Sequence, residues 1–163
     1  MQDVIVVGDG EDGLGIAWFL LKNGLTVSLY GNEGAGNHAM LRCTLKVLGA
    51  TVIGARVDRL SRQHGSFVAE LDNGLTAQSR FVLISEGVPS HYADQLGLAC
   101  LDEGEFLWVD INGMTSLDGV YAVGAKLVRT WGRPWAYTTS RANAPRDLLR
   151  RAKEHLLPTT GQL

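Results

Sequence analysis

A glycine-rich turn between a short apolar strand and a helix is the feature that most constrains the fold of this chain. The segment reads DVIVVGDGEDGLGIAWFLLKNG and places glycines at Gly8, Gly10 and Gly13. The first glycine permits a tight turn, the second lets a ligand approach the backbone, and the third lets the helix pack closely on the strand. Because a helix N-terminus also offers free N–H groups, this turn is typical of a site for a dinucleotide pyrophosphate.

The pattern around this turn predicts an α/β domain with a central parallel sheet. Residues 3–7 are nearly all Val and Ile, residues 13–23 repeat apolar side chains at helical spacing, and residues 25–30 form the next strand. A chain of 163 residues, 45% of them hydrophobic, is long enough for one well-filled core but short for two. We therefore expect a single domain over residues 1–158 and a flexible tail over 159–163.

The middle and end of the chain predict a small antiparallel β-meander and flanking helices. Residues 66–85 alternate between apolar and polar side chains, and Asp72-Asn73-Gly74 supplies the hairpin turn. The expected helices are residues 38–49, 90–98 and 146–157, the last with Pro145 in its first turn.

Charge and composition exclude several function classes. A net charge of −2 and a pI near 6.1 give no overall attraction to nucleic acid or to an acidic membrane surface. The apolar run at residues 16–21 is too short to cross a bilayer, and the first residues do not read as a secretory signal. We expect a cytoplasmic protein with no nucleic-acid or membrane partner.

The chemistry-bearing side chains form no recognisable catalytic or metal site. Cys43 and Cys100 lie far apart without ligand neighbours, so we expect two buried thiols and no metal. The sequence contains no Gly-x-Ser-x-Gly elbow, and nothing places a Ser-His-acid triad. No catalytic residue is predicted.

Several separated segments resemble one protein family, in the family's own order. They are DVIVVGxGxxGL, NGLTVSLY, SFVAELDNG, FVLISEGVP and VDINGMTSLDGVYAVG, of which TSLDGVYAVG is the most specific. Together they resemble the FAD-binding fold of the thioredoxin reductase-like flavoproteins, within the pyridine-nucleotide disulfide oxidoreductase group. The chain has one glycine fingerprint and no Cys-x-x-Cys. The resemblance therefore implies a compact single-domain relative that is not a self-sufficient thioredoxin reductase.

The resemblance also implies which residues would hold FAD. Gly8, Gly10 and Gly13 would contact the pyrophosphate, and Gly87 and Gly124 match further family glycines near the cofactor. The acid that the family places at the end of the second strand falls at Gly31. Glu33 could replace it if the loop bends back.

Five positions depart from the family pattern. Glu11 and Asp12 replace small or apolar residues, Glu86 adds an acid near the mouth, Ala125 replaces an aspartate, and Arg141 stands where a glycine is common. A carboxylate about 5 Å from a phosphate is repelled by roughly 3 kcal/mol at an effective dielectric near 20. The gain from the helix dipole is only about 0.3–1 kcal/mol. These changes count against tight FAD binding.

Three functions remain open at this point. The leading hypothesis is a divergent family member with a degenerate cofactor site. It would act as a non-catalytic binding or subunit-type protein that joins a protein partner or a second copy, as in a dimer. A small FAD-binding oxidoreductase that receives electrons from a separate partner is the alternative. A nucleotide-binding module for a smaller or less charged ligand is the third.

The segment RTWGRPWAY is the most unusual local stretch. Trp131 and Trp135 lie close to Arg129 and Arg133. The tryptophans either form an aromatic and basic surface for a ligand or partner, or fold inward into the space of a flavin ring. Both interpretations imply an altered flavin pocket.

Overall fold

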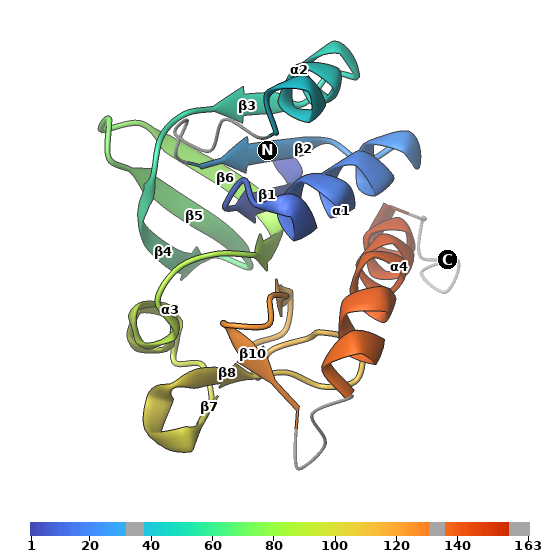
Figure 1. Cartoon of the computed structure of the whole chain (residues 1–163). Coiled ribbons are helices and arrows are strands. Elements are labelled where there is room, and N and C mark those ends of the chain that lie inside the picture. Colours follow the sequence, from blue (N-terminus) through green and yellow to red (C-terminus); the bar gives the residue numbers. More distant parts are fainter. Residues whose placement is uncertain (32–37, 131–135, 157–163) are drawn as a thin grey trace, which may run out of the picture.

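A computed structural model describes residues 1–31, 38–130 and 136–156 of the chain. The predicted fold class is confirmed: within these residues, a mixed sheet has helices packed on it (Figure 1). The sheet has seven strands in the order β3-β2-β1-β6-β5-β4, and β9 pairs with β6. Its strands are β1 (Gln2–Val7), β2 (Val27–Tyr30), β3 (Thr51–Ile53), β4 (Val57–Gln63), β5 (Ser66–Leu71), β6 (Thr76–Ile84) and β9 (Val120–Ala122).

The pairing of these strands agrees with the sequence pattern. β1 pairs in parallel with β2 and β6, in the register Val4 to Val27 and Val4 to Phe81. β4, β5 and the first half of β6 form the expected antiparallel meander. β6 then continues as a parallel strand beside β1 and β9, so one strand joins the meander to the parallel half of the sheet.

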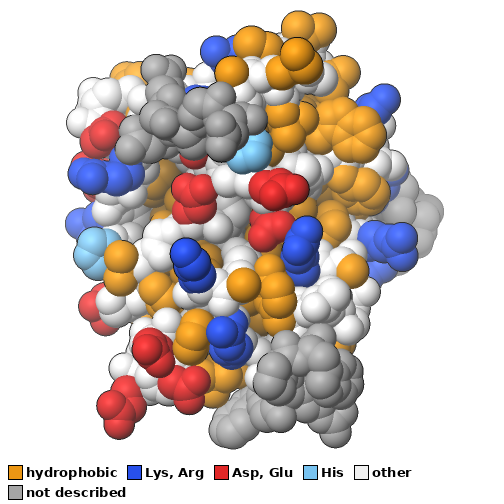
Figure 2. All heavy atoms as spheres, in the orientation of Figure 1, with side chains coloured by type: hydrophobic (Ala, Val, Ile, Leu, Met, Phe, Trp, Pro, Cys, Tyr) orange, Lys and Arg blue, Asp and Glu red, His pale blue; other side chains and the backbone are white. Residues whose placement is uncertain are grey.

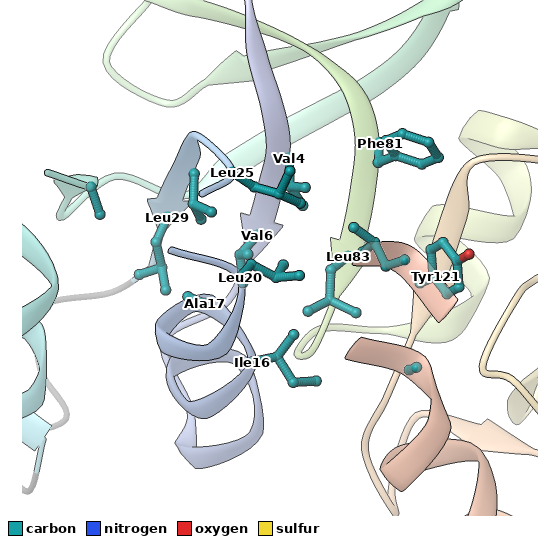
Figure 3. Close-up of a cluster of buried hydrophobic side chains, with 14 of the residues drawn as sticks. Val4, Val6, Ile16, Ala17, Leu20, Leu25, Leu29, Phe81, Leu83 and Tyr121 are labelled. Carbon is teal, nitrogen blue, oxygen red and sulfur yellow. The ribbon is translucent and has the colours of Figure 1, made fainter. Parts of the chain in front are cut away.

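Both faces of the parallel half are covered. Alternate residues of β1 point to opposite faces, so Val4 and Val6 join one hydrophobic cluster while Ile5 and Val7 join the other. The first cluster includes apolar residues of α1 and α4 (Figure 3). The second is covered by α3 and a small sheet below it (Figure 1). The helices are α1 (Glu11–Lys22), α2 (Ala39–Val47), α3 (Pro89–Leu96) and α4 (Ala136–Leu156).

The pairing of three short strands into a separate small sheet was not predicted from the sequence. This sheet consists of β7 (Cys100–Leu101), β8 (Phe106–Trp108) and β10 (Val128–Arg129), with β8 in the middle. Strands of two or three residues carry too few alternating positions to give a periodic signal.

Two further expectations were wrong. α4 begins at Ala136 rather than near Pro145, so this proline lies inside the helix and cannot donate a hydrogen bond to the carbonyl of Arg141. Cys43 is exposed on α2 instead of buried, and Cys100 is half-buried. Among the described residues, no helix is both long and apolar enough to span a membrane.

Candidate functional site

The glycine turn lies where open α/β sheets bind their ligands, at the carboxyl ends of the parallel strands. It connects β1 to α1, and Gly10 is the N-cap residue of that helix. The backbone N–H of Gly8 donates to the carbonyl of Tyr30 at 2.8 Å, and that of Ser85 donates to the carbonyl of Val7 at 2.9 Å. The turn is therefore joined to the ends of β2 and β6.

Two of the three loop glycines are required by contacts with Ser85. A Cβ atom on Gly8 would lie 2.7 Å from Ser85 Oγ, and one on Gly13 would lie 2.5 Å from it. Ser85 Oγ itself donates to the carbonyl of Val7 at 2.8 Å, which fixes it at this position. Gly8 also has a φ of +105°, which side-chain-bearing residues rarely adopt. These two glycines are explained by the packing of the fold.

The third loop glycine faces Glu86. A Cβ atom on Gly10 would overlap Glu86 Oε1. The Glu86 carboxylate lies against the loop at Gly10, and the backbone N–H groups of Asp9 and Gly10 act to lower its pKa. A carboxylate of this chain therefore lies beside the donors that a pyrophosphate would use in a dinucleotide-binding loop.

The surroundings of Glu86 disfavour its negative charge. Burial raises the pKa of Glu86, and the negative charge of Asp9 raises it further. The hydrogen bonds from the N–H groups of Asp9 and Gly10, together with the charge of His38, offset part of this rise. The loop thus accepts one internal carboxylate and already resists its charge, so a second anion is disfavoured.

A buried ion pair fills the neighbouring space at the end of β2. Asp9 Oδ2 accepts from Arg42 Nη1 at 2.8 Å, and the two side chains are 4% and 11% exposed. A Cβ atom on Gly31 would lie 2.5 Å from Asp9 Cγ. An acid at position 31 would therefore collide with Asp9. The carboxylate at this place is instead that of Asp9 in the glycine loop, and Arg42 on α2 neutralises it.

The acid in the first turn of α1 is also paired. Arg141 Nε on α4 lies 3.0 Å from Asp12 Oδ1. Asp12 and Arg141, two departures from the family pattern, thus compensate each other and connect α1 to α4. Glu11 is exposed at the start of α1. The carboxylate that lies against the loop is therefore that of Glu86.

The remaining predicted site residues are spread around the loop. Gly87 has a φ of +122° and lies against the Tyr92 ring, whose hydroxyl donates to the Glu86 carbonyl at 2.6 Å. Burial and the charge of Glu86 raise the pKa of Tyr92 to about 12, so this hydroxyl keeps its proton. Gly124 has a φ of +131°, and a Cβ atom added to it would lie 3.4 Å from the carbonyl oxygen of Ser85. Glu33, Trp131 and Trp135 lie outside the described residues.

A cavity of about 430 Å³ opens beside the loop. Figure 2 shows acidic and basic side chains close together in the middle of the same face. Gly8, Gly31, Glu86 and Gly87 line the cavity, so Glu86 borders both the cavity and the loop. Tyr30, Tyr92, His91 and Gln95 are among the other lining residues.

Sequence reasoning identified the unusual residues here but not their pairing. The ion pairs Asp9–Arg42 and Asp12–Arg141 join positions 33 and 129 residues apart. A signal was present for some of these residues, because two departures from the family pattern, Asp12 and Arg141, pair with each other, and Asp9 fills the space of the missing side chain at Gly31. Arg42 alone gave no signal, since an arginine on an amphipathic helix is ordinary.

Comparisons with known proteins identify the fold. No protein-family model matches the chain, and no curated protein sequence matches it. Among solved structures, the atypical thioredoxin reductase TRi from Desulfovibrio vulgaris Hildenborough aligns with a TM-score of 0.74 at 12% identity, over 94% of this chain and 99% of that one. A thioredoxin reductase from Gloeobacter violaceus gives a TM-score of 0.73 at 11% identity, over 94% and 96%.

A ferredoxin-flavin thioredoxin reductase from Clostridium acetobutylicum is also similar. It aligns with a TM-score of 0.68 at 13% identity, over 96% of this chain and 99% of that one. At this level of identity the likeness concerns the fold alone. The resemblance predicted from the sequence is confirmed at that level: this chain has the fold of the thioredoxin reductases.

Proposed function

We propose that this chain is a thioredoxin reductase-fold protein whose dinucleotide loop is closed by its own Glu86. We infer that it acts as a non-catalytic binding or subunit-type protein. The observation that carries this proposal is the position of the Glu86 carboxylate on the N–H groups of Asp9 and Gly10. These N–H groups are the ones a pyrophosphate needs.

The physical argument is competition between an internal and an external anion. Glu86 follows β6 and is held beside the loop by the fold, so it competes with any free ligand at a high effective concentration. If it stays in place, a phosphate about 5 Å away is repelled by roughly 3 kcal/mol at an effective dielectric near 20. If it leaves, the loop must exchange one set of charge-assisted hydrogen bonds for another.

The test is FAD binding by the purified protein and by two matched variants. Glu86→Ala removes the carboxylate that occupies the loop. Glu11→Ala removes the same charge from an exposed position nearby. We expect the wild type to be colourless and to take up no added FAD through gel filtration. Glu86→Ala should raise FAD affinity at least about tenfold over Glu11→Ala, because the repulsion estimate amounts to about two powers of ten.

Two outcomes would count against the closed loop. Oxidised-flavin bands retained by the wild type would favour the alternative function, a small FAD-binding oxidoreductase supplied with electrons by a separate partner. Equal FAD affinities for Glu86→Ala and Glu11→Ala would mean that Glu86 does not control access to the loop.

Protein association is the part of the proposal that the surface supports. Met40 and Val47 on α2 are 85% and 86% exposed, and Trp18 on α1 is 41% exposed. Figure 2 shows hydrophobic side chains over α1 and α2 at the upper right. Contiguous exposed apolar surface of this kind marks association sites. We propose a second copy as the first partner to test, and light scattering in solution should give the mass of a dimer.

A further inference from the structure

A second hollow lies at the other end of the central sheet, away from the glycine loop. It has a volume of about 210 Å³. Three arginines from three different elements line it: Arg62 on β4, Arg80 on β6 and Arg151 on α4. Arg80 follows Ser79, which pairs with Gln2 at the start of β1, so the hollow is near the amino end of β1 and beside the middle of β6.

Two of these guanidinium groups are held in place by the fold. Arg80 Nη2 donates to Asp3 Oδ1 at 2.6 Å and reaches the carbonyl of Ala152 at 3.5 Å. Burial alone would raise the pKa of Asp3, but hydrogen bonds from Thr26 and Arg80 and the charge of Arg80 outweigh it and lower that pKa. Asp3 therefore stays ionised and holds the Arg80 guanidinium in place.

Arg151 is fixed from the α4 side of the hollow. Its Nη2 lies 2.5 Å from Asp118 Oδ1, and its Nη1 contacts Met114 Sδ at 3.7 Å. Burial would lower the pKa of Arg151, but hydrogen bonds to Tyr121 and Asp118 outweigh it and raise that pKa. The guanidinium carbons of Arg80 and Arg151 lie 5.6 Å and 5.8 Å from the centroid of the Phe81 ring. Figure 3 shows Phe81 and Tyr121 on the same side of β6.

The charges around this hollow are not balanced. Among the described residues, its lining holds three guanidinium groups and one carboxylate, that of Asp118. Asp118 is 72% exposed and so can turn away into water. Arg62 is exposed and makes no ion pair within the described part of the chain. Even with Asp3 counted against Arg80, one positive charge remains.

We propose that Arg62, Arg80 and Arg151 form a binding site for a small oxyanion, whose oxygens replace the Asp118 carboxylate on Arg151. The planar donor forks of arginine match the oxygens of phosphate and carboxylate groups. The volume of about 210 Å³ suits an anion of a few heavy atoms with its water. It lies below the range of roughly 300–1,000 Å³ of pockets for larger ligands. This site is independent of the glycine loop and of the function proposed for it.

The experiment is a titration of the whole protein with inorganic phosphate at constant ionic strength, followed by the backbone amide signals in NMR. Gly65 and Gly119 line the hollow and report on it, whereas Gly8 and Gly10 report on the glycine loop. We expect saturable shifts at Gly65 and Gly119 without shifts at Gly8 and Gly10. A parallel titration with succinate distinguishes a phosphate group from a dicarboxylate as the preferred anion.

Three variants test the assignment while keeping the side chains of Arg80 and Arg151. Arg62→Ala should weaken phosphate binding about tenfold, the size of one lost charge-assisted hydrogen bond. Arg59→Ala removes the same charge three residues earlier on β4, from a side chain that does not line the hollow, and should have much less effect. Asp118→Asn removes the internal competitor and should tighten phosphate binding severalfold.

The outcomes separate the site from general attraction. Equal weakening by Arg62→Ala and Arg59→Ala would overturn the proposal, because only overall charge would then matter. Shifts confined to Gly8 and Gly10 would overturn it as well, since the anion would then occupy the glycine loop. The absence of any saturable shift with either phosphate or succinate would have the same consequence.

Discussion

The two ends of the central sheet differ in which groups make them positive and in whether a carboxylate of the chain covers those groups. At the carboxyl ends of the parallel strands, backbone N–H groups of the glycine loop face the Glu86 carboxylate. Near the amino end of β1, guanidinium groups line a hollow whose one lining carboxylate among the described residues, Asp118, is exposed to water. The first end is positive through its backbone and is closed, whereas the second is positive through its side chains and is open.

This difference shows how little of a dinucleotide site depends on its glycines. Gly8, Gly10 and Gly13 are all present, and each is explained by an atom of Ser85 or Glu86 within the chain. Two of the acids around them, Asp9 and Asp12, pair with Arg42 and Arg141 from different helices. A glycine fingerprint can therefore persist because packing requires it, while acids beside it pair with arginines of the same chain.

The largest expected effect concerns the buried pair at the closed end. Asp9→Ala leaves the Arg42 guanidinium, which is 11% exposed, without its partner. Removing one member of a buried ion pair typically costs about 3–5 kcal/mol. We expect Asp9→Ala to lower the free energy of unfolding by about 3 kcal/mol, measured by urea denaturation.

The matched control is the double variant Asp9→Ala with Arg42→Met. It removes both charges and keeps an apolar side chain on α2, so most of the lost stability should return. A single variant as stable as the wild type would mean that Arg42 turns into solvent and that the pair does not hold the closed end together.

The second prediction separates Gly8 from Gly10. Gly8→Ala forces a side chain into a φ of +105°, which costs about 2 kcal/mol, and its Cβ would lie 2.7 Å from Ser85 Oγ even after Glu86 is replaced. Gly10 has a φ of −70° and a ψ of 173°, which any residue adopts. Gly10→Ala should therefore cost about 1 kcal/mol through the displaced Glu86 carboxylate, and nothing in a Glu86→Ala background.

A double-mutant cycle measured by thermal and urea unfolding checks this expectation. Coupling between positions 10 and 86 that accounts for most of the cost of Gly10→Ala, while most of the cost of Gly8→Ala persists in the Glu86→Ala background through its φ and Ser85, supports the closed loop. If Gly10→Ala costs the same with and without Glu86, the carboxylate does not rest on the loop in solution.

The parts of the molecule that the sequence predicted share a physical reason. β1 is nearly all Val and Ile, α1 and the meander repeat apolar residues over enough positions to give a period, and Asp72-Asn73-Gly74 marks a turn by itself. The early start of α4 was missed because Pro145 looked like a first-turn residue. Of the candidate site, the loop glycines and the added acids were visible in the sequence. The pairing of Asp9 with Arg42 and the convergence of Arg62, Arg80 and Arg151 depend on packing between distant segments.

The last prediction concerns pH, because carboxylates at the two ends respond to it in opposite directions. The pKa of Glu86 is raised above its ordinary value of 4.5, so its ionisation costs stability as the pH rises through the folded-state pKa. The pKa of Asp3 is lowered below its ordinary value of 3.8, so its contribution is present above that value and is lost as the pH falls through the folded-state pKa.

Unfolding free energies of the wild type, Glu86→Gln and Asp3→Asn between pH 3 and pH 7 check both signs. Glu86→Gln should gain on the wild type as the pH rises above about 4.5, because the amide carries no charge to repel Asp9. Asp3→Asn should be the less stable protein at neutral pH, and the gap should narrow as the pH falls below about 3.8. Each variant's difference in unfolding free energy from the wild type should therefore change with pH in the opposite direction to the other's. If both differences change in the same direction, the contrast between Glu86 at the glycine loop and Asp3 beside Arg80 is wrong.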